Sequence, residues 1–347
     1  MSRTIKAVAI QPSLRIGEVD WNLRRCADLV TQAAREHSPD VIMLPEACTS
    51  PNAHGPLMLD VARPVDGEPL QVLRGLAREH GCQVGAGFIA IRGNETRGTY
   101  ALCEPDGAVH LHDKDLPSFW ENSYYRPGKD AGIAETALGP FGLANGWEWG
   151  RTQTCTRLLG RVKLIGGGMH FPSYPDWALT RKWFIERDQE LFTQYGRELP
   201  GRVARFLGVP AIHPSHVGEF EMDTPMVPGL KWRSHTIGQT QITDADGLRL
   251  AYLGYEDGEG YVAAEVELED APVPRDPLPQ TFWNSEFPIS AHVVWLAGNA
   301  HGRTAYRLKS LLGRHRWQPS PDLPDHVPAG VLPDPAPPAT GAGAGVA

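Results

Sequence analysis

The chain has 347 residues, of which 41% are hydrophobic and 21% are charged, and this composition is typical of a globular protein. Its formal net charge is −8, which argues against sequence-independent binding to nucleic acid, because such binding needs a basic face that neutralises phosphates. No apolar run approaches the roughly 20 residues that a membrane-spanning helix needs, and the N-terminus has no secretory pattern. We therefore expect a cytoplasmic protein that binds neither nucleic acid nor membrane.

The predicted elements alternate between strands and helices along the chain. Strands are predicted at residues 5–10, 40–44, 83–91, 99–103, 109–112, 209–214, 237–244, 249–253 and 260–268. Helices are predicted at residues 21–36, 70–80 and 178–206, and a strand–helix–strand unit at 141–167. Strand-rich halves with helices between them indicate a layered α/β fold.

The composition changes near the C-terminus. Eight prolines lie between Pro319 and Pro338, with no Lys or Arg among them, so we predict a disordered tail over residues 318–347. The main domain is expected to cover residues 1–270. Residues 271–317 are expected to form an extension that packs either on this domain or on a dimer partner.

The five cysteines are an odd number and include no C-x-x-C pair. A disulfide framework and a structural zinc site are therefore not expected, and we predict no metal site. Most of the thiols are predicted to be small buried groups. The cysteines are Cys26, Cys48, Cys82, Cys103 and Cys155.

Three segments place charged or turn-forming residues at the ends of predicted strands, where open α/β sheets have their functional sites. Glu46 follows the strand at residues 40–44. Lys114 follows the strand at 109–112, and Glu121 comes soon after it in an aromatic-rich stretch. The third segment, residues 142–154, has the pattern of a strand, a tight turn and a helix start.

Taken in this order, these segments resemble the nitrilase, or carbon–nitrogen hydrolase, superfamily over about residues 6–268. The resemblance implies a four-layer α-β-β-α sandwich that forms homodimers or higher homo-oligomers. It also implies a Glu-Lys-Cys site that acts on a small-molecule substrate with no metal or organic cofactor. By position, Glu46 would be the general base, Lys114 the stabiliser of the developing oxyanion, and Glu121 a second carboxylate that positions groups.

The chain departs from the family pattern at the turn. Members of the superfamily carry the nucleophilic cysteine there, in a Cys-aromatic-acid step, whereas this chain has Gly146-Trp147-Glu148. Loss of the nucleophile costs about 10⁶ in rate in a well-studied hydrolase, so ordinary amide or nitrile hydrolysis is expected to be nearly absent. A glycine at this position is also expected to leave free the volume of a CH₂–SH group, which a substrate could fill.

Several functions are compatible with this pattern. The site could use Glu46, Lys114 and Glu121 for cyclisation, condensation or dehydration, in which the substrate supplies the attacking group. Alternatively, the protein could be catalytically dead and bind a ligand or partner, or residue 146 could be an engineered Cys-to-Gly change in an amidase or nitrilase. A substitute thiol, with Cys48 as the candidate, or direct attack by water is a further alternative.

Aromatic and polar residues near the three segments are expected to contact the substrate. These are Trp120, Tyr125, Asn145, Trp147, His170 and Phe171. Their number indicates a substrate with an aromatic or extended apolar part. His110 and His112 alternate on one face of a strand and are expected to be partly buried structural histidines.

Overall fold

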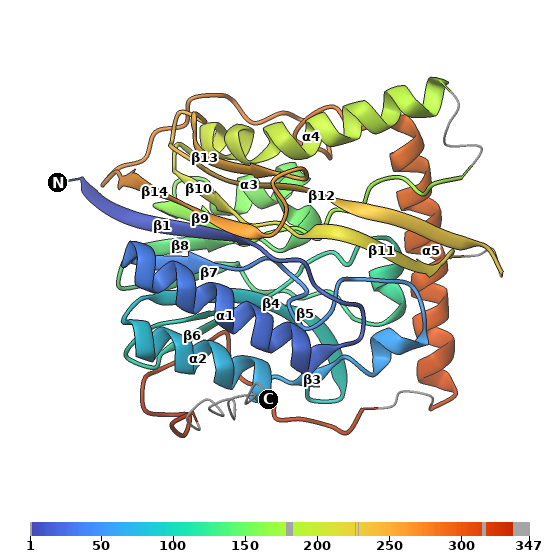
Figure 1. Cartoon of the computed structure of the whole chain (residues 1–347), viewed down its shortest axis with the longest axis horizontal. Coiled ribbons are helices and arrows are strands. Elements are labelled where there is room, and N and C mark those ends of the chain that lie inside the picture. The colour runs from blue at the N-terminus through green and yellow to red at the C-terminus, as the bar shows by residue number, and fades with distance from the viewer. Residues whose placement is uncertain (1, 178–182, 226, 228, 314–316, 336–347) are drawn as a thin grey trace, which may run out of the picture.

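The strands form two mixed β-sheets that lie face to face (Figure 1). The computed structural model describes residues 2–177, 183–225, 227, 229–313 and 317–335. The first sheet has the order β14 (Gly260–Leu268), β1 (Arg3–Gln11), β2 (Val41–Met43), β4 (Gln83–Arg92), β5 (Glu95–Cys103), β6 (Val109–Asp113) and β15 (His326–Val327), and β3 (Arg63–Pro64) pairs with β4. The second has the order β11 (Val217–Asp223), β12 (Lys231–Thr243), β10 (Ala211–His213), β9 (Leu164–Gly166), β8 (Gly139–Leu143) and β7 (Ile133–Thr136), and β13 (Arg249–Gly254) pairs with β12.

Helices cover the outer faces of both sheets. The helices α1 (Val19–His37) and α2 (Glu68–His80) pack on the first sheet, and α3 (Thr152–Leu158) and α4 (Trp183–Leu207) pack on the second (Figure 1). Apolar side chains such as Met43, Tyr100 and Phe141 fill the space between the sheets. The layers therefore follow the order α-β-β-α, and the expected four-layer sandwich is confirmed. No helix among the described residues is both long enough and apolar enough to cross a membrane.

The predicted elements agree with most of those observed, but the helix α5 (Ile289–Leu311), the strands β7 and β11 and the two-residue strands β3 and β15 were not predicted. The face of α5 that packs against the short helix η2 (Phe119–Ser123) contains glycines. It therefore lacks the regular spacing of apolar side chains from which an amphipathic helix is predicted. A Cβ on Gly298 would lie 2.1 Å from the Phe119 ring, so only glycine allows this close packing. The predicted helix start at residues 178–182 lies outside the described residues.

The C-terminal segment also differs from its prediction in part. Residues 318–335 lie along the first sheet, where β15 pairs with β6 and Val327 is buried. Arg92 and Arg74, which belong to other parts of the chain, donate hydrogen bonds to the backbone of this segment. Tertiary contacts therefore order residues that lack a helical or strand pattern of their own. Residues 336–347, the rest of the predicted disordered tail, lie outside the described part.

Candidate active site

Glu46, Lys114 and Glu121, distant in sequence, meet in one buried cluster, the charged cluster. Lys114 Nζ lies 3.0 Å from Glu46 Oε2 and 2.8 Å from Glu121 Oε2. All three side chains are buried, and Lys114 has no exposed surface. One ammonium group therefore bridges two carboxylates away from bulk water.

Each member of the charged cluster is fixed by the backbone around it. Lys114 directly follows β6, and its N–H donates to the carbonyl oxygen of Gly98 on β5 at 2.9 Å. Glu121 lies in η2, and its carboxylate accepts a hydrogen bond from the N–H of Ser118 at 2.6 Å. Glu46 follows β2, and its carboxylate accepts a hydrogen bond from the N–H of His170 at 2.9 Å.

The burial of the charged cluster changes the proton affinities of its members. Burial raises the pKa of Glu46 to about 7, since it outweighs the opposing charge of Lys114 and is reinforced by Glu121. Burial alone would lower the pKa of Lys114, but Glu121 and Glu46 raise it above its ordinary value. Glu46 can therefore gain or lose a proton near neutral pH, while Lys114 remains a cation.

The chain turns sharply after β8, at Asn145 and Gly146, where the short helix η3 (Gly146–Gly150) begins; we call this turn the elbow. Gly146 has a φ of +60°, and an ideal Cβ on it would lie 2.3 Å from Lys114 Nζ and 2.5 Å from both carboxylate oxygens of Glu46. The elbow therefore faces the charged cluster directly. The expectation that a glycine here leaves free volume for a substrate is wrong, because Glu46 and Lys114 fill that space.

An aromatic pocket of about 80 Å³ lies beside the charged cluster, with Glu121 in its lining. Its aromatic walls include Trp120, Trp147, Tyr174, Phe192, Trp232, Phe287 and Trp295. His170 and Asn52 also line it, and Asn52 Nδ2 donates to Glu121 Oε1 at 2.8 Å. Ala291, Val294 and Trp295 of α5 line it as well, so the C-terminal extension lies across this pocket.

The predicted substrate-binding residues divide into two groups. Trp120, Trp147 and His170 line the aromatic pocket. The other three lie outside its lining: the Tyr125 ring packs against Gly98, Asn145 Nδ2 donates to the Gly98 carbonyl oxygen at 3.0 Å, and Phe171 stacks on Phe192 in the core.

Sequence reasoning missed Asn52 and Trp232, and it left open whether the C-terminal extension that contains α5 packs on this domain or on a dimer partner. Trp232 and Trp295 lie far from the three motif segments in sequence, so no spacing linked them to the site. A weak signal existed for Asn52, because it follows Glu46 by six residues in a loop.

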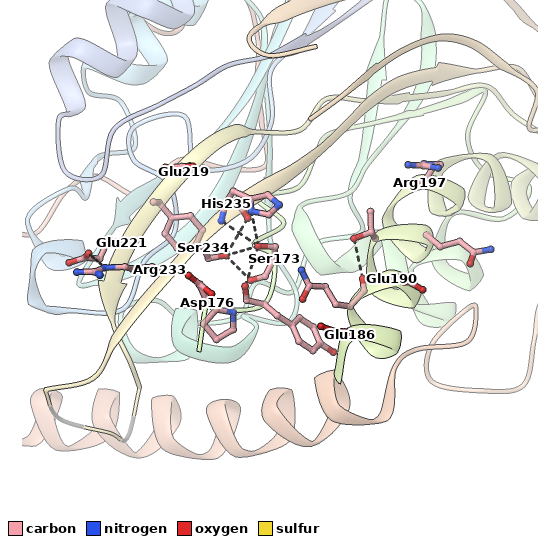
Figure 2. A pocket seen from close by; sticks show the side chains of 16 residues that line it. Ser173, Asp176, Glu186, Glu190, Arg197, Glu219, Glu221, Arg233, Ser234 and His235 are labelled. Atoms are coloured by element: carbon pink, nitrogen blue, oxygen red, sulfur yellow. Dashed lines mark hydrogen bonds and ion pairs between the residues drawn. The ribbon is translucent and has the colours of Figure 1, made fainter. Parts of the chain in front are cut away.

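A second and larger groove, of about 1180 Å³, adjoins the aromatic pocket and shares Ser173 and Tyr174 with it (Figure 2). Most of its lining residues are of polar type, and carboxylates outnumber cations among them. The carboxylates are those of Asp176, Glu186, Glu190, Glu219 and Glu221. None of the three charged-cluster residues lines this groove. The larger opening is thus separate from the buried Glu–Lys–Glu arrangement.

All five cysteines, each within the described residues, are buried and unpaired, as predicted. Cys48, the candidate substitute thiol, donates to the carbonyl oxygen of Pro45 at 3.1 Å, and burial raises its pKa well above the ordinary value. Burial also raises the pKa of Cys155 to about 12. Both thiols are therefore poor nucleophiles at neutral pH, because only the thiolate attacks readily. Within the described ranges, no group of His, Cys, Asp and Glu side chains is arranged to hold a metal ion.

A sequence model of the carbon–nitrogen hydrolase family matches residues 6–161 of this chain. Among curated proteins, none matches this sequence.

Solved structures share the fold over most of the chain. A carbon–nitrogen hydrolase from Helicobacter pylori G27 is 20% identical, with 76% of this chain and 89% of that chain covered and a TM-score of 0.61. The CN-hydrolase superfamily protein XC1258 from Xanthomonas campestris is 16% identical, with 77% and 91% covered and a TM-score of 0.59. An amidase from Nesterenkonia sp. is 15% identical, with 84% and 96% covered and a TM-score of 0.57. At these identities the similarity is one of fold.

Proposed function

We propose that this chain, which belongs to the carbon–nitrogen hydrolase superfamily, is an enzyme that acts on a carbon–nitrogen bond of a small molecule without a cysteine nucleophile. In this proposal Glu46 is the general acid–base, Lys114 stabilises developing negative charge, and Glu121 holds Lys114 in place. The observation that carries the proposal is the buried Glu46–Lys114–Glu121 cluster, which faces a glycine elbow beside an aromatic pocket.

We propose that Gly146 occupies the position of the nucleophile in related enzymes. In a variant of the Nesterenkonia sp. AN1 amidase, which has a similar fold, the acetamide moiety of fluoroacetamide is added covalently at an active-site cysteine. Residue 146 of this chain offers no atom that could form such a bond. In this proposal the attacking group comes from the substrate, as in an intramolecular cyclisation or a condensation.

The proton affinities of the charged cluster fit such a reaction. Ionised Glu46 would accept the proton of a substrate amine as its nitrogen attacks a carbonyl or imine carbon of the substrate. Proton transfer would neutralise Glu46 and weaken its hold on Lys114. The ammonium group would then be free to turn towards the oxygen or nitrogen that gains negative charge, while Glu121 keeps it anchored.

The aromatic pocket supports a substrate with an aromatic or extended apolar part. Asn52 Oδ1 and His170 Nε2 are buried in its lining and have no hydrogen-bond partner among the described residues. A buried polar atom without a partner is costly, so a ligand that hydrogen-bonds to these atoms would be favoured. The small molecule is the partner that this proposal requires; we further propose that the chain assembles as a homo-oligomer.

Paired assays would test the proposed function. The unmodified chain and the Gly146→Cys variant would be incubated with aromatic and aliphatic amides, nitriles and amino-acid-derived precursors, and products would be followed by mass spectrometry. We expect turnover by the unmodified chain that is lost in Glu46→Gln and in Lys114→Ala. Glu104→Gln is a matched control, because Glu104 is a buried carboxylate that pairs with His110 elsewhere in the fold. Hydrolysis by Gly146→Cys alone, or ligand binding without turnover by either chain, would contradict the proposal.

A further inference from the structure

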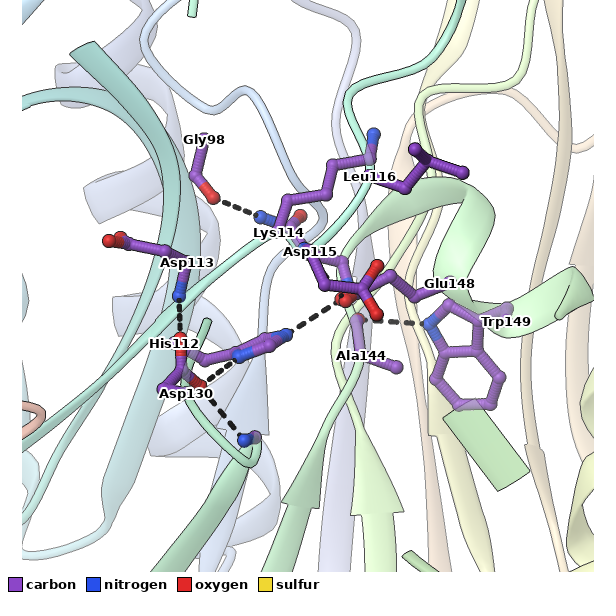
Figure 3. Close-up of polar contacts among 12 residues, drawn as sticks. Gly98, His112, Asp113, Lys114, Asp115, Leu116, Asp130, Ala144, Glu148 and Trp149 are labelled. Atoms are coloured by element: carbon purple, nitrogen blue, oxygen red, sulfur yellow. Dashed lines mark hydrogen bonds and ion pairs between the residues drawn. The ribbon is translucent and has the colours of Figure 1, made fainter. Parts of the chain in front are cut away.

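His112 lies fully buried between two carboxylates at the end of β6 (Figure 3). Its Nδ1 lies 2.5 Å from Asp130 Oδ1, and its Nε2 lies 2.7 Å from Glu148 Oε2. An ionised carboxylate only accepts hydrogen bonds, whereas a neutral imidazole has a single N–H. Two such contacts therefore call for the imidazolium form, in which both ring nitrogens donate.

Glu148 in turn joins two backbone segments of the candidate site. Its Oε2 accepts a hydrogen bond from the N–H of Asn145 at 2.7 Å, and its Oε1 accepts one from the N–H of Asp115 at 3.0 Å. Asn145 directly precedes Gly146 in the elbow, and Asp115 directly follows Lys114. One carboxylate thus fixes the distance between the elbow and the backbone that carries the lysine.

The charges around His112 balance without any contribution from Lys114. The carboxylates of Asp115, Asp130 and Glu148 are matched by His112, Arg151 and Arg157, which contact them directly. Burial alone would lower the pKa of His112, but Glu148 and Asp130 raise it to about 10. These three carboxylates are already paired, so they do not compete for the ammonium group of Lys114, which remains with Glu46 and Glu121.

We propose that His112 is a positioning residue: as a buried imidazolium it holds Glu148 in the place from which that carboxylate locks the Gly146 elbow against the Lys114 strand end. The inference rests on the proposed function only where it concerns catalysis. The hydrogen bonds from both backbone segments to Glu148 support the positioning role itself. This geometric part can be tested without any substrate.

Hydrogen exchange and NMR test the geometric part in the full chain. His112→Gln removes one of the two donors and the positive charge. The matched control is His110→Gln, two residues earlier on β6, since His110 is also buried and pairs with a single carboxylate, Glu104, at 2.9 Å. In His112→Gln we expect the amides of Asn145 and Gly146 to exchange about tenfold faster than in the unmodified chain, because local opening of the elbow becomes easier.

The control variant should leave the exchange of these two amides unchanged. In the unmodified chain, ¹⁵N spectra should show both ring nitrogens of His112 protonated at pH 8. A neutral His112 ring at pH 8, or equal elbow exchange in the two variants, would overturn the inference even if the protein has no enzymatic activity.

Kinetics test the catalytic meaning once turnover has been found. At a temperature where His112→Gln is folded, we expect kcat to fall by about a hundredfold with little change in KM, since misplaced catalytic groups slow the chemical step and His112 does not line the aromatic pocket. An unchanged kcat in the folded variant would show a purely structural role. A chain without turnover would contradict the proposed function but leave the exchange result intact, so the two failures are distinguishable.

Discussion

Gly146 and Lys114 face each other so closely that a Cβ on residue 146 would lie 2.3 Å from the Lys114 ammonium nitrogen. The glycine also has a φ of +60°, in the left-handed region that other residues adopt at a cost. Two independent constraints, backbone conformation and space, therefore select glycine in this arrangement of the site.

The first prediction separates these two constraints. Gly146→Ala should lower the free energy of unfolding by about 2–4 kcal/mol, since backbone strain adds to overpacking against Glu46 and Lys114. Gly258→Ala is the control. Gly258 has a φ of +70°, but a Cβ there would have nothing within 4 Å, so the free energy of unfolding should fall by only about 1 kcal/mol. Urea unfolding of both variants measures the difference. Equal losses would mean that Glu46 and Lys114 move aside freely.

The second prediction concerns the pH dependence of turnover. Glu46 acts as a base only when ionised, and burial raises its pKa to about 7. The value of kcat/KM should therefore rise with pH and reach half its plateau near pH 7, because this quantity reports the free enzyme. In Glu46→Gln the rise should disappear, with a rate about 10²- to 10⁴-fold lower. A rise centred near pH 4.5, the ordinary value for Glu, would contradict the buried cluster.

The third prediction tests how the charged cluster is held together. Lys114→Met leaves Glu46 and Glu121 buried without a cation, and breaking such a pair costs about 3–5 kcal/mol. The loss should be largest at pH 8 and smaller at pH 5, because burial raises the pKa of Glu46 and this carboxylate can take up a proton at the lower pH. Lys163→Met is the control, because Lys163 pairs with Asp270 near the surface and should change stability by at most about 1 kcal/mol. A pH-independent loss in Lys114→Met would argue against charge repulsion as the cause.

The sequence allowed buried strands and functional residues at strand ends to be predicted for a clear physical reason. Continuous apolar runs such as residues 5–10 and 40–44 can be satisfied only in sheets buried on both faces. Glu46 follows one of these apolar runs and Lys114 follows the strand at residues 109–112, and functional residues gather at strand ends in α/β sheets. These positions indicated functional residues at strand ends, whereas the four-layer order and the grouping of Glu46, Lys114 and Glu121 in one site were implied by the resemblance to the nitrilase superfamily.

The remaining features depend on contacts that no local pattern records. α5 packs through Gly298 and Gly302, whose missing side chains leave no apolar period. His112 has a role only because Asp130 and Glu148, from two other segments, close on it in space. The supposed free volume at residue 146 could not be judged from sequence either, since the neighbouring charged side chains fill it.

The fourth prediction concerns the C-terminal segment that lies along β6. Val327 is 1% exposed and lies in β15, whereas Val331 is 64% exposed in the same segment. Val327→Ala should therefore cost about 1–3 kcal/mol, and Val331→Ala less than about 0.5 kcal/mol. Hydrogen exchange gives a local readout, because the N–H of Leu111 on β6 donates to the carbonyl oxygen of Asp325 at 2.7 Å. Unchanged exchange at Leu111 in Val327→Ala would mean that the segment contributes little to this edge of the sheet.

The fifth prediction follows from the buried imidazolium. The pKa of His112 is raised to about 10 by Glu148 and Asp130 against the effect of burial, and its unfolded value is about 6.5. A raised pKa means that the folded state holds the proton more tightly. The stabilisation is therefore complete below pH 6.5, declines as pH increases and is lost above about pH 10.

Urea unfolding between pH 6 and pH 10.5 measures this effect as the difference between the unmodified chain and His112→Gln. The difference should shrink by several kcal/mol across the range, since each pKa unit corresponds to about 1.4 kcal/mol. Taking the difference cancels the titration of lysines and tyrosines that both proteins share. A constant difference would mean that His112 is neutral in the folded protein and that its two short contacts involve a protonated carboxyl group instead.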